Sequence, residues 1–270
     1  MTSTSEHAAQ IPTGLDGVEV SLDDHIATVT FSRPPNNFFD LELVSALGDA
    51  FESLDRVPEC RVIVLRGEGK HFCAGAKLGA TEEDLISTAK GAQNPLYEQA
   101  VRLAGCHVPV VAAVQGAAIG GGLGLATVAD FRVGAPEARF AANFSLLGMH
   151  HGFGLTVTLP DIVGQQAALD LLYTGRRVGG EEALRIGLLD RLVPADQVFA
   201  VAHELAASIA ASAPLAVREI RSTMRGDLAE RMGKATLREH TAQRELRKTD
   251  DYREGVTAYG ERRSPNFQAR

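Results

Sequence analysis

The sequence of 270 residues contains no tryptophan, and only 6% of its residues are aromatic. Basic residues are also in deficit, because 27 Lys and Arg stand against 34 Asp and Glu and the formal net charge is −7. No Lys/Arg-rich stripe with interleaved aromatic residues offsets this balance, which argues against a nucleic-acid partner. An anionic ligand would therefore have to be bound by local groups.

Cysteine is scarce as well. Cys60, Cys73 and Cys106 are widely separated and form no CxxC pair, a pattern typical of a reducing compartment. The sequence has no HExxH motif and no Cys/His set with zinc-ligand spacing, so we expect no metal site.

Long apolar runs are missing too. None reaches the roughly 20 residues that span a bilayer, and the polar N-terminal residues lack the apolar core of a signal peptide. We therefore expect a flexible N-terminal tail over residues 1–14, no membrane span and a cytoplasmic location.

Apolar periodicity predicts an α/β fold. Strand and helix patterns alternate up to about residue 145, which favours parallel strands joined by crossover helices. The elements predicted in this part include a hairpin over 17–32, helices over 40–56 (with Asp40 as N-cap) and 94–106, and buried strands over 61–67 and 108–116.

The second half of the sequence has a different pattern. From about residue 157 onward it is almost entirely helical, and residues 214–250 are rich in Arg and Glu. We predict a core domain over residues 15–195 and a C-terminal helical part over residues 196–270.

Two stretches contain runs of residues with little or no side chain. GKHFCAGAKL (69–78) and GAAIGGGLGL (116–125) each follow a predicted buried strand, and the second leads directly into a short predicted helix. A helix N-terminus presents unpaired N–H groups and a partial positive charge. Because small residues let a substrate approach the main chain, N–H donors from two such turns could form an oxyanion hole.

Other interpretations of these glycines were weighed. A dinucleotide-binding loop needs an acidic residue about 20 positions further on, at the end of a second strand, and no residue suits. A phosphate-binding P-loop needs Gly-Lys-Ser/Thr, which is absent. Close packing of a helix on a strand explains either stretch taken alone.

Three further stretches accompany these two in a fixed order: FSRPPNNFF, LLYTGRRVGGEEALRIGLLDRLVP and DDYREGVTAYGERRSPNF. Together they make residues 15–268 resemble the enoyl-CoA hydratase/isomerase (crotonase) superfamily. The resemblance implies a crotonase-type spiral of ββα units with a C-terminal helical trimerisation part, and so a homotrimer or hexamer. It implies an acyl-CoA thioester as ligand, with coenzyme A as part of the substrate and no separate cofactor.

The resemblance also assigns roles to residues. The N–H groups of Ala76 and Gly121 become the oxyanion donors for the thioester enolate. The remaining substrate contacts are expected from Pro34, Asn36, Gly75, Lys77 and Gly120, and the coenzyme A side, on a weaker basis, from Arg262, Arg263 and Phe267.

The sequence departs from the family pattern at two positions. Hydratases of the family use two glutamates to hold water, and the resemblance places these at Gly124 and Phe144. Neither residue accepts a proton, so we expect the two-glutamate mechanism to be missing. Both positions should still contact the substrate.

Two histidines that follow Phe144 in the sequence are candidates to replace the missing bases. His150 and His151 suit a general base near neutral pH, and a dry pocket beside Phe144 would lower a histidine pKa. Alternatively, one histidine faces solvent and the other satisfies a loop carbonyl. Asn143 either orients a water or substrate carbonyl or is a turn residue.

Two further residues and one acidic segment are expected to have mainly structural roles. Asp130 is expected to be structural and Cys73 to be a packing residue without a nucleophilic role. The acidic run over 81–84 is interpreted as a solvated helix start, from which a carboxylate could also turn inward.

Three functions remain open at this level. The first is an acyl-CoA enzyme that isomerises, hydrolyses a C–C bond, decarboxylates or hydrates with another base. The second is an acyl-CoA-binding protein without turnover, and the third is the same scaffold reused for a substrate that is not a CoA ester.

Overall fold

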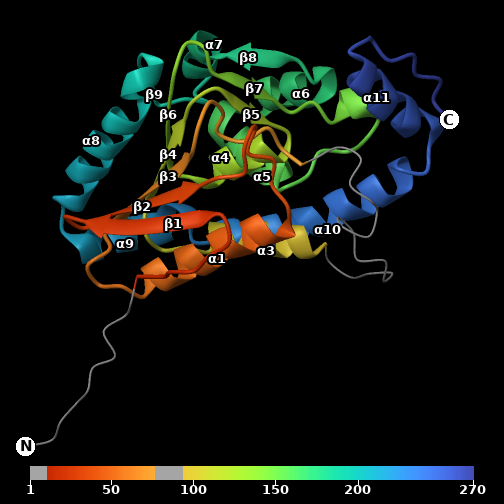
Figure 1. Cartoon of the computed structure of the whole chain (residues 1–270). Coiled ribbons are helices and arrows are strands. Elements are labelled where there is room, and N and C mark those ends of the chain that lie inside the picture. Colours follow the sequence, from red (N-terminus) through yellow and green to blue (C-terminus); the bar gives the residue numbers. More distant parts are fainter. Residues whose placement is uncertain (1–10, 77–93) are drawn as a thin grey trace, which may run out of the picture.

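A six-stranded sheet of order β1-β2-β3-β4-β6-β9 organises the computed structural model, which describes residues 11–76 and 94–270 (Figure 1). Its strands pair in parallel from β2 to β9, and only β1 and β2 are antiparallel. Their bounds are Val18–Asp23 for β1, Ile26–Phe31 for β2, Val62–Gly67 for β3, Val110–Val114 for β4, Phe131–Gly134 for β6 and Arg191–Leu192 for β9.

The predicted hairpin is confirmed. Asp24 and His25 form its two-residue turn, and both have positive φ values, 42° and 68°. Positive φ at both central positions is the conformation that matches the twist of an antiparallel strand pair.

A second, three-stranded sheet has the order β5-β7-β8. From β4 to β7, consecutive strands alternate between the two sheets. β4 and β6 belong to the first sheet, and β5 and β7 belong to the second. Cys73 extends this sheet by a parallel bridge to Ala118 in β5. The bounds are Ala117–Ile119 for β5, Arg139–Ala141 for β7 and Arg177–Gly179 for β8.

Helices cover both sheets (Figure 1). The predicted N-cap of α1 is confirmed, because the Asp40 carboxylate accepts a hydrogen bond from the Leu43 N–H at 2.8 Å. The bounds are Leu41–Asp55 for α1, Pro95–Ala104 for α3, Gly121–Val128 for α4, Leu155–Val163 for α5, Gln165–Thr174 for α6, Gly180–Arg185 for α7, Val198–Ala210 for α8, Pro214–Arg225 for α9, Leu228–Leu246 for α10 and Asp250–Glu261 for α11.

The prediction for the second half of the chain needs one correction. Residues beyond 157 are mainly helical as expected, but β8 and β9 also lie there. They have three and two residues, too few to produce an alternating pattern.

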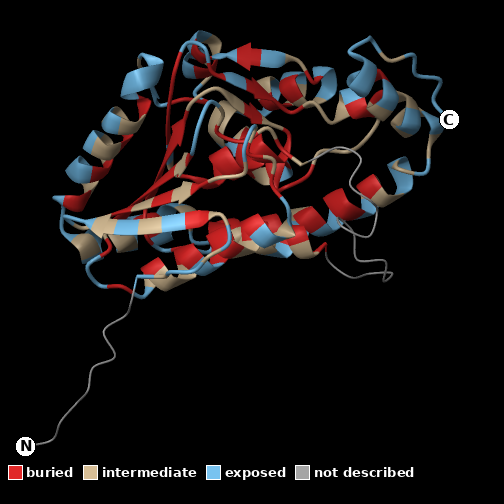
Figure 2. Ribbon diagram, viewed as in Figure 1, coloured by how far each residue is buried: buried red, intermediate tan, exposed pale blue. Residues whose placement is uncertain are grey.

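The core lies on both faces of the six-stranded sheet, whose inner strands are buried (Figure 2). On one face α8 packs with one side only, through Val198, Ala202, Ala206 and Ala210. This spacing of four residues forms a single apolar stripe on a helix. The larger cluster on the other face includes side chains from α1, α3, α4 and α5.

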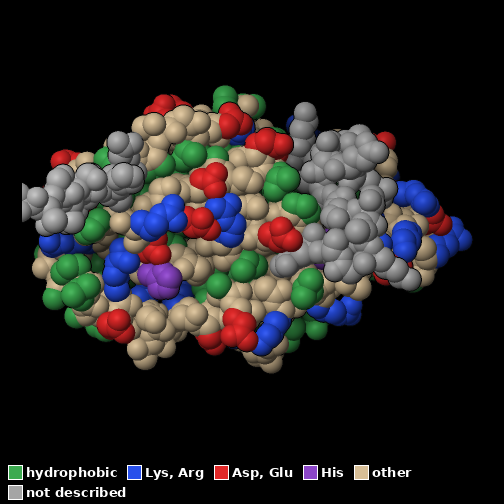
Figure 3. Space-filling model, turned by 90° about the horizontal axis from the view of Figure 1, so that it is seen from below, with side chains coloured by type: hydrophobic (Ala, Val, Ile, Leu, Met, Phe, Trp, Pro, Cys, Tyr) green, Lys and Arg blue, Asp and Glu red, His purple; other side chains and the backbone are tan. Residues whose placement is uncertain are grey.

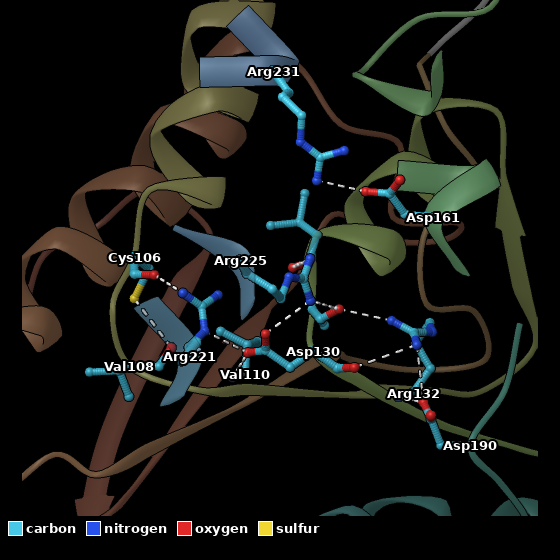
Figure 4. A network of polar contacts seen from close by, with 12 residues as sticks. Cys106, Val108, Val110, Asp130, Arg132, Asp161, Asp190, Arg221, Arg225 and Arg231 are labelled. Atoms are coloured by element: carbon cyan, nitrogen blue, oxygen red, sulfur yellow. Dashed lines mark hydrogen bonds and ion pairs between the residues drawn. The ribbon is translucent and has the colours of Figure 1, made fainter. Parts of the chain in front are cut away.

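Asp130 connects the C-terminal helices to the sheet (Figure 4). Its carboxylate accepts hydrogen bonds from the Val110 N–H at 2.7 Å and from the Arg221 Nε and Arg225 Nη1 atoms of α9 at 2.9 Å each. Arg132 pairs with Asp190 at 3.1 Å and so joins β6 to the start of β9. The structural role expected for Asp130 is confirmed.

The surface over α1 and α3 carries acidic and basic side chains interspersed, as Figure 3 shows. Arg102 of α3 pairs there with Asp49 and Glu52 of α1. Among the described helices, none is by itself long and apolar enough to cross a membrane. The helical segments 195–210 and 214–246, which are bent relative to each other, have the length and composition of a membrane span only when taken as a pair.

We predict that Asp130→Asn lowers the free energy of unfolding by about 3 kcal/mol, because it leaves two largely buried guanidinium groups without their carboxylate. Urea denaturation followed by circular dichroism measures the change. Asp161→Asn is the matched control, since Asp161 pairs with Arg231 at a half-exposed site and should cost less than about 1 kcal/mol. Equal losses in the two variants would contradict the structural role of Asp130.

Candidate active site

A cavity of about 390 Å³ opens where the second sheet meets the C-terminal helices. Its wall is formed by the turn after Cys73, the start of α4, the loop before α5, and parts of α3, α10 and α11. Among the described residues that line it there is no carboxylate and no histidine, and Arg247 is the one charged side chain. The cavity is therefore mainly apolar and aromatic, with a few polar groups.

Six of the predicted site residues line this one cavity: Gly75, Ala76, Gly120, Gly121, Asn143 and Phe144. The two glycine-rich stretches are brought together by backbone pairing. Cys73 donates its N–H to the Ala117 carbonyl at 2.9 Å and accepts from the Ile119 N–H at 3.0 Å. Because the two segments run in parallel, their carboxyl ends lie side by side, and the residues that follow them meet.

Close packing explains why side chains are small here. Gly75 has φ of +90°, and a Cβ atom on it would lie 2.7 Å from the Ile119 carbonyl oxygen. A Cβ atom on Gly122 would lie 2.2 Å from the Cys73 carbonyl oxygen. A larger side chain at either position would force the two turns apart.

Two backbone N–H groups on the cavity wall are without acceptors in the described part of the chain. Gly121 begins α4, so its N–H has no helical partner, and its N-cap Gly120 offers no side chain. The Ala76 N–H also donates no hydrogen bond to another described residue. Nearby, the Gly75 carbonyl is used, because it accepts from the Phe39 N–H at 3.0 Å.

Aromatic rings cover the start of α4. Phe39 and Phe153 lie 5.5 Å apart between ring centroids and, with Phe144, line the cavity. A Cβ atom on Gly124 would lie 2.7 Å from the Phe153 side chain. The space beside Gly124 is thus filled by a phenylalanine, and Gly124 itself is not part of the cavity wall.

The histidine pair lies beside the cavity and not on its wall. His150 and His151 stack with ring centroids 4.0 Å apart, while their neighbours Met149 and Gly152 line the cavity. His150 Nδ1 donates to the His151 carbonyl at 2.7 Å. One of the two histidines thus satisfies a loop carbonyl, as one of the two interpretations expected.

His151 belongs to a chain of hydrogen bonds that ends at a buried carboxylate. The Thr156 hydroxyl donates to Glu239 Oε1 at 2.6 Å, so it accepts from His151 Nε2 at 2.9 Å, and Nε2 carries the proton. Burial, followed by the charge of His150, lowers the pKa of His151 to about 4, and burial raises the pKa of Glu239. The direction agrees with that expected for a histidine in dry surroundings, although His151 does not lie on the cavity wall.

Polar groups of the cavity wall come from residues that the sequence did not indicate as part of the site. The Tyr97 hydroxyl of α3 donates to Gln243 Oε1 of α10 at 2.7 Å, and Gln243 Nε2 donates to the His150 carbonyl at 2.8 Å. Burial raises the pKa of the Tyr97 phenol, which therefore stays protonated. Arg247, Tyr252 and Tyr259 complete this side of the cavity.

The other predicted residues lie elsewhere. Asn36 accepts from the Ala74 N–H at 3.1 Å and so supports the turn, but neither it nor Pro34 lines the cavity. Lys77 and the acidic run over 81–84 lie outside the described residues.

The coenzyme A contacts expected at the C-terminus stay a prediction. Arg263 is paired with Glu254 at 2.6 Å and with Glu261 at 2.6 Å, so its charge is already compensated. Arg262 ends α11 in a left-handed conformation, and both it and Phe267 are exposed. These residues do not form a free basic patch within this chain.

Cys73 is fully buried, and burial raises the pKa of its thiol to about 12. A protonated thiol is a poor nucleophile, so the packing role expected for Cys73 is confirmed. Within residues 11–76 and 94–270, no cluster of three His, Cys, Asp or Glu side chains is close enough to hold a metal ion.

Comparisons with known proteins identify the family. The enoyl-CoA hydratase/isomerase family matches residues 22–270, and the chain belongs to this family. Probable enoyl-CoA hydratase EchA14 of Mycobacterium tuberculosis (strain ATCC 25618 / H37Rv) is 36% identical over 232 residues, covering 86% of this chain and 89% of the relative. Carnitinyl-CoA dehydratase of Salmonella arizonae is 34% identical over 262 residues, covering 94% and 98%.

Solved structures agree with the fold expected from the sequence. The enoyl-CoA hydratase/isomerase from Pseudoalteromonas atlantica T6c superposes with a TM-score of 0.83 at 30% identity and covers 93% of this chain and 100% of that one. The crotonase-type α/β fold with a C-terminal helical region is thereby confirmed.

We predict that His151→Gln flattens the acid side of the stability profile. Between pH 6.5 and about 4 the unfolded chain binds a proton at this site that the folded chain does not. The free energy of unfolding therefore decreases as pH falls through this range, by about 2–3 kcal/mol. Glu239, with its raised pKa, acts in the opposite sense and is present in both proteins. Urea denaturation at several pH values measures the slope, and His203→Gln on α8 serves as control. An unchanged slope in His151→Gln would contradict the burial of that ring.

We further predict that Gly124→Ala lowers the free energy of unfolding by about 1 kcal/mol, because overpacking against Phe153 outweighs the better helix propensity of alanine. Combining it with Phe153→Leu should give a favourable coupling energy of about 1 kcal/mol in a double-mutant cycle. Additive effects would show that Phe153 does not fill this space.

Proposed function

We propose that the protein binds an acyl-CoA thioester and stabilises its enolate, with the N–H groups of Ala76 and Gly121 as the oxyanion hole. The observation that carries this proposal is the presence of two N–H groups, from separate turns and without described acceptors, on the wall of one apolar cavity. Membership of the enoyl-CoA hydratase/isomerase family supports the choice of substrate class.

The chemistry follows from where charge develops. When a thioester becomes an enolate, its carbonyl oxygen gains negative charge, and donors that are already oriented stabilise it without reorganisation. Phe39, Phe144 and Phe153 line or border this place and keep its dielectric constant low, which strengthens each hydrogen bond. The partial positive charge at the start of α4 acts in the same direction.

The residues around the proposed thioester site limit the reactions that are possible there. The positions that the resemblance assigns to the two hydratase glutamates are Gly124 and Phe144, and the described cavity wall contributes no carboxylate. This disfavours addition of water held by two glutamates and leaves isomerisation, C–C hydrolysis or decarboxylation as the candidate reactions. Decarboxylation fits well, since loss of carbon dioxide leaves an enolate without a base having to remove a proton.

The second candidate is an acyl-CoA-binding protein without turnover. It is favoured by the same lack of a proton acceptor on the described wall, where His150 and His151 are also not found. The two candidates differ in one measurable property, since only the first requires that the bound thioester become an enolate more easily than in water.

Assembly and location are part of the same proposal. On α9, Leu215, Ile220 and Met224 are exposed at 78%, 63% and 74%, and we propose that such apolar surface is buried in a homotrimer or hexamer. The three free cysteines support a reducing, cytoplasmic location.

We predict that acetoacetyl-CoA bound to the protein ionises at a lower pH than in water, because its enolate oxygen accepts both N–H groups. The enolate absorbance of bound acetoacetyl-CoA, recorded as a function of pH, measures this. Ala76→Pro removes one donor and should weaken enolate binding by about 100-fold, whereas Ala76→Gly keeps the N–H and serves as the matched control. Thermal melts establish that both variants fold.

Three results would decide otherwise. Binding of acetoacetyl-CoA in its keto form alone would favour the candidate without turnover. Equal effects of Ala76→Pro and Ala76→Gly would remove Ala76 from the oxyanion hole. Failure to bind any CoA ester would reject the thioester proposal as a whole.

A further inference from the structure

Arg247 is a cation on the wall of an apolar cavity, and no described residue serves as its counter-ion. It is half-buried, and its Nε atom is buried with no hydrogen-bond partner. It forms no ion pair with any described residue, and its guanidinium lies over the Tyr252 ring, 5.9 Å from Cζ to the centroid. That distance is at the outer limit of a cation–π interaction, so most of the donor capacity of the guanidinium is unused.

The neighbouring polar groups cannot satisfy Arg247. Gln243, one helical turn earlier on α10, uses its carbonyl for Tyr97 and its amide for the His150 carbonyl. The described cavity wall supplies no Asp or Glu. A guanidinium stays charged at every physiological pH and presents five donors, and a partly buried charge without a partner is unfavourable.

A ligand anion would provide the missing partner. We propose that Arg247 binds an anionic group of the substrate, and that this group is a carboxylate on the acyl chain, so that the substrate class is an acyl-CoA with a second carboxylate. This inference rests on the proposed acyl-CoA function. It goes beyond that function because it distinguishes dicarboxylic from simple fatty acyl thioesters.

The acyl chain is favoured over the phosphates of coenzyme A by the surroundings of Arg247. Its neighbours Gln243 and Tyr97 are 2% and 5% exposed, and the same wall carries Leu96, Leu147 and Phe153. Buried apolar side chains suit a hydrocarbon chain, and a planar guanidinium suits the two oxygens of a carboxylate.

The test compares ligands that differ only in the distal charge. Isothermal titration calorimetry would measure binding of succinyl-CoA and glutaryl-CoA, of butyryl-CoA and pentanoyl-CoA, and of free coenzyme A. We expect at least one dicarboxylic ester to bind on the order of tenfold more tightly than the neutral ester of equal carbon number. Arg247→Gln should abolish this preference, while Arg247→Lys should keep part of it.

The matched control is Arg238→Gln, since Arg238 is exposed on the same helix and its loss should leave the preference intact. A similar preference in wild type and Arg247→Gln would overturn the inference. So would equal weakening of every ligand, free coenzyme A included, because the guanidinium would then bind phosphate. Binding of the neutral esters without any preference overturns this inference alone, whereas failure of all CoA esters to bind rejects the proposed function with it.

Discussion

The pairing of Cys73 with β5 is the constraint on which the site depends. Two backbone hydrogen bonds, from Cys73 to Ala117 and from Ile119 to Cys73, hold two segments parallel that are more than 40 residues apart in the chain. Parallel strands end at the same edge of a sheet, so the turn at 74–76 and the start of α4 must meet there. Ligands characteristically bind at such an edge, beyond the carboxyl ends of parallel strands.

This approach of main chain to main chain determines the composition around it. Gly75 and Gly122 are glycines because a Cβ atom would contact a carbonyl of the other segment. Phe39 and Phe153 fill the space beside Gly121, and Phe153 also fills the space beside Gly124. The same packing crowds Gly124, where an added Cβ atom would contact the Phe153 side chain.

The sequence predicted those features that depend on local patterns. The hairpin turn, the Asp40 cap and the buried strands follow from alternation and capping residues, and small residues after strands indicated where main chain would be exposed. The polar side of the cavity was not predictable in this way. Gln243 lies in α10 and Arg247 caps its end. This helix is rich in Glu and Arg, and spacing alone cannot tell its solvated face from a face that closes a cavity. Nor could periodicity show that His150 and His151 turn toward a loop carbonyl and Thr156, because these contacts depend on where α5 and α10 pack.

The central claim is that two backbone N–H groups polarise a thioester carbonyl. The most direct measurement is the infrared carbonyl stretch of butyryl-CoA labelled with carbon-13 at the thioester carbon, recorded as an isotope-edited difference spectrum of the complex. Two oriented donors weaken the C=O bond, so the account predicts a band at lower frequency than for the same thioester in water. A bound thioester with a band at or above its frequency in water would contradict the account.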